Sequence, residues 1–152
     1  MTKTRKARVD DLPTVNRLTN EMHHYLANLY GLKLSSKELE EEHFDEEELR
    51  NVYVADSEEN EVIGYVSFSK GENEIAGPYY EVEHLVVAEK YRRLNVGRML
   101  LNIVLERAKK ENANMTTATP ARNQEALKFY EELGFRPLSM VLLLDLQGRI
   151  PK

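Results

Sequence analysis

The sequence contains no cysteine. This absence excludes disulfide bonds, thiolate zinc ligands and a cysteine nucleophile, and it favours a reducing compartment. The H-E-x-x-H pattern of a histidine zinc site is missing as well, so the sequence predicts no metal centre. We therefore expect a cytoplasmic protein whose chemistry uses side chains with oxygen and nitrogen atoms.

Long apolar runs are also missing. No stretch approaches the roughly 20 apolar residues of a membrane-spanning helix, and residues 1–12 are basic without the apolar core of a secretory signal. We expect no membrane partner. The 152 residues, with 41% hydrophobic and 31% charged side chains, have the size and composition of a single globular domain spanning residues 1–152.

Positive charge is in deficit. The formal net charge is −5, and much of the acid lies in residues 38–48, ELEEEHFDEEE. Because nucleic acid is bound through basic surfaces, this balance argues against a nucleic-acid partner. The balance is compatible with a cationic substrate, although a solvated acidic helix face is the simpler interpretation.

Hydrophobic periodicity divides the chain into short strands and amphipathic helices. The predicted strands are Lys3–Val9, Val52–Ala55, Val62–Ser69, Tyr79–Val87, Met115–Thr119 and Leu138–Leu146. The predicted helices are Leu12–Leu29, Ser36–Arg50, Val96–Glu111 and Asn123–Leu133. Early strands follow one another as hairpins, and later strands alternate with helices. This order predicts an α/β (α+β) fold, with a mixed, mostly antiparallel twisted sheet of about six to seven strands flanked by about four helices.

The segment Tyr91–Leu101 combines a basic turn with the start of a helix. The first turn of a helix leaves backbone N–H groups unpaired, and these groups and the helix dipole attract an anion. Gly97 has no side chain to keep a ligand off the backbone, and Asn95 tolerates a left-handed backbone. Three arginines add forked donors for phosphate oxygens: Arg92, Arg93 and Arg98. The segment therefore predicts a diphosphate site.

Neither GxGxxG nor GxxxxGK[ST] is present, but Glu83–Leu101 resembles another phosphate-binding motif. It is similar to the acyl-CoA-binding motif of the GNAT superfamily of N-acyltransferases, which ends in Q/R-x-x-G-x-G/A. Asn95 stands where the family has glycine. The resemblance implies a GNAT-like fold and acetyl-CoA as co-substrate. It places the pyrophosphate and the pantetheine arm on Leu85, Val86, Val87, Arg92, Arg93, Leu94, Asn95, Val96, Gly97 and Arg98.

A second segment, Asn123–Phe135, carries the resemblance further. It reads NQEALKFYEELGF and is similar at every marked position to the family pattern N-x-x-A-x-x-F-Y-x-x-x-G-F. The resemblance implies that Asn123 contacts the pantetheine arm and that Tyr130 donates a hydrogen bond to the CoA sulfur. A phenol is protonated at neutral pH and can act as this acid. Without the resemblance, Tyr130 would be interpreted as core packing and Asn123 as a helix cap.

Acetyl transfer to an amine also needs a group that accepts a proton, because a lysine-like amine is almost fully protonated at pH 7. Glu83 matches a glutamate found in many family members and is our first candidate. Glu81 would lie on the same face of an ideal strand, about 7 Å away. His84 would lie on the opposite face, and it is a candidate because histidine ordinarily titrates near neutrality. Water remains a further candidate, and a strand bulge would reassign these faces.

These observations predict an N-acetyltransferase in which Glu83 and Tyr130 are catalytic. Acetyl-CoA and a primary amine would meet in one ternary complex, because there is no cysteine to carry the acetyl group. The acceptor is a cationic small amine or a peptide or protein amine, and Tyr25, Tyr30 and Phe44 are candidates to line its pocket. The family also implies a possible homodimer. The alternative function is a non-catalytic acyl-CoA-binding sensor or interaction module.

Overall fold

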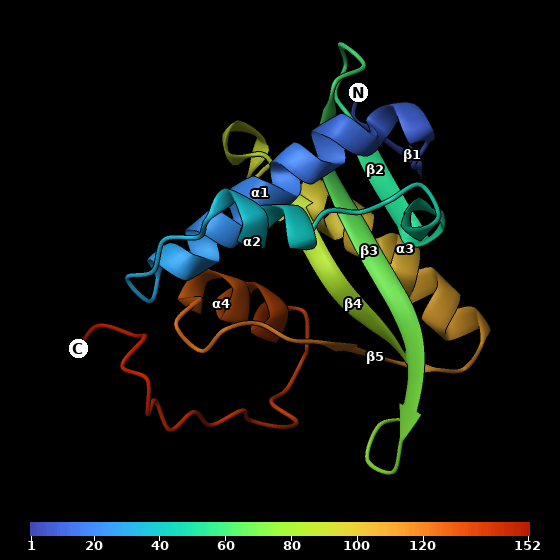
Figure 1. The fold of residues 1–152 in the computed structure, drawn as a ribbon. Helices are drawn as coiled ribbons and strands as arrows, with labels where there is room; N and C mark the ends of the chain where they lie inside the picture. The colour runs from blue at the N-terminus through green and yellow to red at the C-terminus, as the bar shows by residue number, and fades with distance from the viewer.

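The computed structural model describes residues 1–152 and contains one sheet with helices on both faces (Figure 1). The strands are β1 (Lys3–Lys6), β2 (Val52–Asp56), β3 (Val62–Asn73), β4 (Gly77–Val87) and β5 (Asn114–Thr117). The helices are α1 (Leu12–Asn28), α2 (Ser36–Glu41), α3 (Val96–Lys110) and α4 (Gln124–Glu132). Short 3₁₀ turns occupy Val9–Asp11, Glu48–Asn51 and Glu89–Tyr91. None of the helices is long and apolar enough to cross a membrane.

The strand order in the sheet follows the order in the sequence, β1-β2-β3-β4-β5. Neighbouring strands are antiparallel up to β4, and β4 pairs with β5 in parallel. A parallel pair requires a crossover, and α3 supplies it between these two strands. The mixed, mostly antiparallel sheet expected from the sequence is confirmed, as are the successive hairpins of its first part.

Two hydrophobic cores hold the layers together. On one face, α3 packs Leu100 and Val104 against residues of β3 and β4 such as Val66 and Val82, all buried. On the other face, α1 packs Val15 and Leu18 against Val54 of β2 and Tyr65 of β3. The residues that face α1 and those that face α3 alternate along β2 from Val52 to Ala55, as the two-residue period of a strand requires, whereas bulges interrupt the alternation in β3 and β4.

The sheet has five strands, fewer than the six to seven predicted from the sequence. The difference lies in Leu138–Leu146, which forms no strand and stays exposed; the exposed fraction is 98% at Val141 and 85% at Leu142. A strand requires a neighbour that pairs with its backbone. In the structure this apolar run pairs with no strand, and β5 remains the edge strand of the sheet.

The helix predicted over Ser36–Arg50 is also shorter than expected. It begins as predicted, with the Ser35 side chain accepting a hydrogen bond from Glu38 N, but α2 ends at Glu41. Asn16 of α1 explains the end, because its side chain accepts from the Phe44 backbone N–H at 2.8 Å and donates to Phe44 O at 3.3 Å. These tertiary hydrogen bonds replace the helical ones and bring the Phe44 ring against the sheet.

A partly buried ion cluster anchors the start of the chain. Arg5 of β1 donates to both carboxylate oxygens of Asp11, at 2.8 and 2.9 Å, and to both of Asp56 of β2, at 2.7 and 3.2 Å. Asp11 also accepts from Arg8 N at 2.7 Å. The hydrogen bond from Arg5 lowers the pKa of Asp11, more than burial raises it.

We expect Asp11→Asn to lower the free energy of unfolding by about 2 kcal/mol at pH 7, because Arg5 loses a charged partner. The folded-state pKa of Asp11 lies below its unfolded value. Its contribution is therefore fully present above about pH 4 and is lost as the pH falls through the folded pKa. Urea unfolding at several pH values measures this. The exposed Asp10→Asn is the control; equal losses in both variants at pH 7 would contradict the assignment.

Candidate active site

The strands β4 and β5 separate within the sheet. Their pairing runs from Tyr79 opposite Asn114 to Val82 opposite Thr117, and there β5 ends. From His84 to Val87, β4 pairs only with β3, and Glu83 has no partner on either side. This half of β4 thus has one backbone edge without a strand partner. Of the predicted pantetheine contacts, Leu85 and Val87 have their N–H groups on this edge, whereas Val86 lies opposite Tyr65 with its backbone groups toward β3, in the same phase as Ala88, which donates to Ile63 O.

The turn between β4 and α3 has two residues in the left-handed backbone region. Asn95 has φ 66° and ψ 9° and is the N-cap of α3, as its tolerance of this conformation predicted. Arg93 has φ 67°. The turn lifts Leu94 into solvent, where 63% of it is exposed. Val96 is buried in the α3-side core, so only its backbone N–H is available to a ligand.

The arginines of this turn are exposed and pair with no carboxylate. Arg92 donates to Val87 O at 3.2 Å and lies 5.8 Å from the centre of the Tyr25 ring. Arg93 and Arg98 make no side-chain hydrogen bond within the protein. Three guanidinium groups therefore surround the N-terminus of a 15-residue helix with its first N–H groups free.

Gly97 faces the space between β4 and α4. A Cβ atom built at this residue would lie 3.7 Å from Phe129 Cζ and 3.9 Å from Val87 Cγ2, which are ordinary contacts. The protein itself therefore has room for a methyl group, and the glycine leaves a cradle beside the free N–H groups. The turn thus fits a diphosphate in shape, donors and charge.

We expect Asn95→Gly to leave the turn unchanged or slightly more stable, because both residues adopt φ near 66°. Asn95→Ala should cost about 1 kcal/mol of unfolding free energy, since alanine is strained in the left-handed region. Chemical denaturation of the two variants measures the difference. Equal stabilities would show that the backbone at this residue is not the constraint.

The second motif forms helix α4 beside the separated strands. Asn123 caps the helix, and its side chain accepts a hydrogen bond from Ala126 N at 3.3 Å. Tyr130 lies among aromatic rings, 5.2 Å from Phe129 and 5.2 Å from Phe135 between ring centres. Burial raises the pKa of Tyr130, and the Thr117 hydroxyl lowers it by less. The phenol is therefore protonated at neutral pH, at the point where β5 ends.

A bulge interrupts β4 at Glu83. Val82 is opposite Phe68, and His84 is opposite Ser67, so Glu83 has no partner on β3. A bulge of this kind inserts one residue and shifts the phase of the side chains after it.

The shift changes which side chains share a face. Val82 and Leu85 both belong to the α3-side core. Between them, His84 contacts Phe44 and other residues of the α1 side, and Glu83 lines a hollow together with Phe44. Glu83 and His84 thus lie on the same face, whereas an ideal strand would place them on opposite faces.

The hollow beside Glu83 has a volume of about 210 Å³. Its lining comes from β3, β4 and the turn after α2, and comprises Phe44, Glu48, Arg50, Asn51, Ser67, Phe68 and Glu83. Ser67 is 4% exposed, and its hydroxyl has no hydrogen-bond partner. A polar group with donor capacity would satisfy this oxygen, so the hollow suits a polar ligand.

Residues 17–135 match the acetyltransferase (GNAT) family. The chain belongs to this family. Among curated proteins, no sequence matches it. The GNAT assignment agrees with the two motifs, because the matched range contains both the turn at Arg92–Arg98 and the segment Asn123–Phe135.

Solved structures share the fold of this GNAT protein. A tetramutant of BH1408 from Bacillus halodurans has a TM-score of 0.78 at 19% identity, covering 95% of this chain and 99% of that one. An acetyltransferase from Trypanosoma brucei has 0.68 at 21% identity, covering 96% and 100%. The aminoglycoside N-acetyltransferase AAC(6')-Iy in complex with CoA has 0.70 at 17% identity, covering 97% and 95%.

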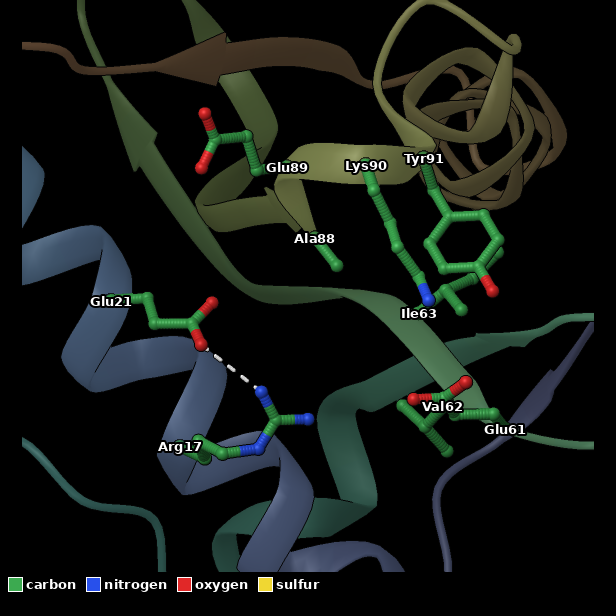
Figure 2. Close-up of a pocket in the computed structure, with 9 residues that line it drawn as sticks. All are labelled: Arg17, Glu21, Glu61, Val62, Ile63, Ala88, Glu89, Lys90 and Tyr91. Carbon is green, nitrogen blue, oxygen red and sulfur yellow. Dashed lines mark hydrogen bonds and ion pairs between the residues drawn. The ribbon is translucent and has the colours of Figure 1, made fainter.

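A larger hollow of about 330 Å³ lies elsewhere on the GNAT chain, between α1, the start of β3 and the turn after β4 (Figure 2). Arg17 and Glu21 of α1 form an ion pair of 3.0 Å beside it. It contains neither Glu83 nor Tyr130. Volume alone therefore does not identify the candidate active site.

The GNAT structure also adds polar residues that the sequence analysis missed. The hydroxyls of Tyr65, Ser67 and Thr117 lie beside the candidates His84, Glu83 and Tyr130, and the Thr19 hydroxyl contacts Tyr65. Only Tyr65 could have been found from the sequence. It lies inside the apolar run VIGYVSFS, and a buried phenol needs a hydrogen-bond partner.

The three aromatic residues predicted to line the acceptor pocket lie in different places. Phe44 lies beside Glu83, whereas Tyr25 packs on Arg92 and Tyr30 on Arg122.

Proposed function

We propose that this protein is an acetyl-CoA-dependent N-acetyltransferase that moves the acetyl group directly to a primary amine. The observation that carries the proposal is the free edge of β4 at Glu83–Val87, which runs from the diphosphate turn to Tyr130. An extended pantetheine arm can pair with such an edge as an added strand would. The pyrophosphate of the cofactor would then lie at the turn before α3, and its thioester sulfur would lie near Tyr130.

Each candidate residue has one task in this proposal. Arg92, Arg93, Arg98 and the N–H groups of α3 hold the pyrophosphate. The carboxylate of Glu83 takes a proton from the amine, directly or through water, and the Val87 N–H faces the developing oxyanion. Tyr130 holds the proton that the departing thiolate needs. The chain has no cysteine to form an acyl-enzyme, in agreement with direct attack.

The acceptor is a cationic small amine or a peptide amine. The hollow at the bulge is lined by the two carboxylates of Glu48 and Glu83 and by one guanidinium, Arg50, and the chain carries a net charge of −5. The excess of acidic groups favours a cation. The similar fold AAC(6')-Iy is an aminoglycoside N-acetyltransferase. The identity of 17% limits this likeness to the fold, so aminoglycosides enter the test as one class among others.

Release of free CoA thiol from acetyl-CoA in the presence of an amine panel tests the proposal. The panel should contain polyamines, aminoglycosides and lysine peptides, with mass detection of the acetylated product. Because the protein has no thiol of its own, every thiol that appears comes from CoA. Calorimetric binding of acetyl-CoA without thiol release from any amine would favour the sensor or interaction module instead.

We expect Glu83→Gln to lower kcat by about 100-fold, since a positioned base contributes on the order of 10²–10⁴ in rate. Acetyl-CoA affinity should remain unchanged, because the cofactor pairs with the backbone edge of β4 and does not need the Glu83 side chain. Steady-state kinetics with the best amine of the panel and a binding titration measure both quantities. Glu81→Gln is the matched control, because it lies in the paired part of β4. A larger loss in that variant would transfer the role to Glu81.

A further inference from the structure

A chain of hydrogen bonds leads from α1 through the sheet to His84. Thr19 Oγ1 donates to Val15 O at 2.8 Å, and it lies 2.7 Å from the Tyr65 hydroxyl. That hydroxyl lies 3.1 Å from His84 Nδ1. Thr19 and Tyr65 are almost completely buried. Their hydroxyl groups therefore form hydrogen bonds with protein groups rather than with water.

The single protons of these hydroxyl groups fix the direction of the chain. Thr19 uses its proton toward Val15 O, so it accepts from Tyr65. Tyr65 then has no proton left for the imidazole and must accept from it. His84 is therefore the tautomer with its proton on Nδ1, and its Nε2 carries a lone pair.

The lone pair of His84 Nε2 is available. Nε2 has no hydrogen-bond partner in the protein and is not among the enclosed unpartnered atoms. The ring is surrounded by Tyr65 of β3, Phe44 of the turn after α2, and His23 of α1. Burial lowers the pKa of His84 to about 4, with a smaller lowering from His23 and an opposing effect from Glu42. The imidazole is neutral over the range in which the enzyme would work.

The bulge places His84 on the same face of the sheet as Glu83. The two residues are consecutive, and both lie between Val82 and Leu85, which turn to the other face. A neutral primary amine has two N–H groups and one lone pair. Two acceptors on the same face can bind both N–H groups and leave the nitrogen lone pair directed at the acetyl carbon.

We propose that His84 is a positioning residue that selects primary over secondary amines, by accepting at Nε2 the second N–H of an acceptor already bound to Glu83. The hydrogen bonds of Thr19 and Tyr65 hold the imidazole proton on Nδ1, so that Nε2 can accept a hydrogen bond. A secondary amine has a single N–H and gains nothing from His84. This role rests on the proposed function, and it adds a selectivity that Glu83 alone does not supply.

The kinetic test compares the best primary amine of the panel with its N-methyl derivative. We expect His84→Leu to lower kcat/KM for the primary amine about tenfold, the effect of one hydrogen bond, and to leave the N-methyl derivative unaffected. His84→Gln, which retains an acceptor oxygen, should recover part of the loss. His24→Gln, an exposed histidine on α1, is the control. Equal losses for both amines, or none, would overturn the role.

A second measurement does not depend on turnover. Imidazole ¹⁵N–¹H correlation spectra of the free protein at pH 7 should show His84 with the proton on Nδ1, and Tyr65→Phe should remove this preference while retaining the ring contacts. An Nε2–H tautomer in the wild type, together with normal acetyl transfer, would overturn the role of His84 alone. Absence of transfer from the wild type to every amine would instead overturn the proposed function, and the role of His84 with it.

Discussion

Replacing Tyr130 with phenylalanine is expected to lower kcat by about 100-fold and to change acetyl-CoA affinity little. The phenylalanine ring keeps the contacts with Phe129 and Phe135, but the proton for the departing thiolate is lost. Because burial raises the pKa of Tyr130, the wild-type phenol keeps its proton throughout the neutral range and donates rather than accepts. Pre-steady-state and steady-state kinetics, with a separate acetyl-CoA titration, measure the two quantities.

The control for this variant is Tyr53→Phe. Tyr53 lies on β2, away from the separated strands, and its hydroxyl accepts from Arg107 at 2.6 Å. The variant loses the hydroxyl of another half-buried tyrosine without touching the candidate site. An unchanged kcat in Tyr130→Phe would reject Tyr130 as the acid. An equal loss of kcat in Tyr53→Phe would show that the effect comes from a less stable fold.

The double substitution of Arg93 and Arg98 by glutamine is expected to weaken acetyl-CoA binding by about 100-fold. Each charge-assisted hydrogen bond to a phosphate contributes about 1.5–3 kcal/mol. Both side chains are exposed, and no protein group depends on them, so thermal stability should not change. The affinity of the wild type should also fall with added salt, and that salt dependence should be reduced in the variant.

Calorimetry of acetyl-CoA binding at two salt concentrations measures this effect. Arg136→Gln supplies the matched control, because Arg136 is exposed and lies outside the turn. If the double variant bound acetyl-CoA as tightly as the wild type, the diphosphate would have to lie elsewhere, and the hollow near Lys90 and Tyr91 would be the next place to probe (Figure 2).

The sequence predicts the parts of this fold that depend on local pattern. The three- and four-residue spacing of Val15 and Leu18 gives α1, and the capping residues Ser35 and Asn123 mark where α2 and α4 begin. Asn95 was expected to tolerate a left-handed backbone, and it adopts one. Each of these outcomes follows from residues that are neighbours along the chain.

The remaining differences arise from partners that are distant in the sequence. The end of α2 depends on Asn16, 28 residues before Phe44. The face of the sheet on which His84 lies depends on how β3 and β4 align at the bulge. The apolar run Leu138–Leu146 has the composition of a strand, but no local pattern states whether another strand is within reach. Arg93 in a left-handed conformation has no sequence signal, because this conformation is rare for arginine.

The free edge of β4 provides a spectroscopic signal of its own. Amide hydrogens on that edge between Glu83 and Val87 have no strand partner once β5 ends at Thr117, and they should exchange rapidly with solvent in the free protein. The amides of β4 that pair with β3 should exchange slowly. If acetyl-CoA takes the position of the missing strand, its addition should slow exchange at the free edge alone. The mass spectrum of a peptide covering these residues would then record cofactor binding before any acceptor amine is known.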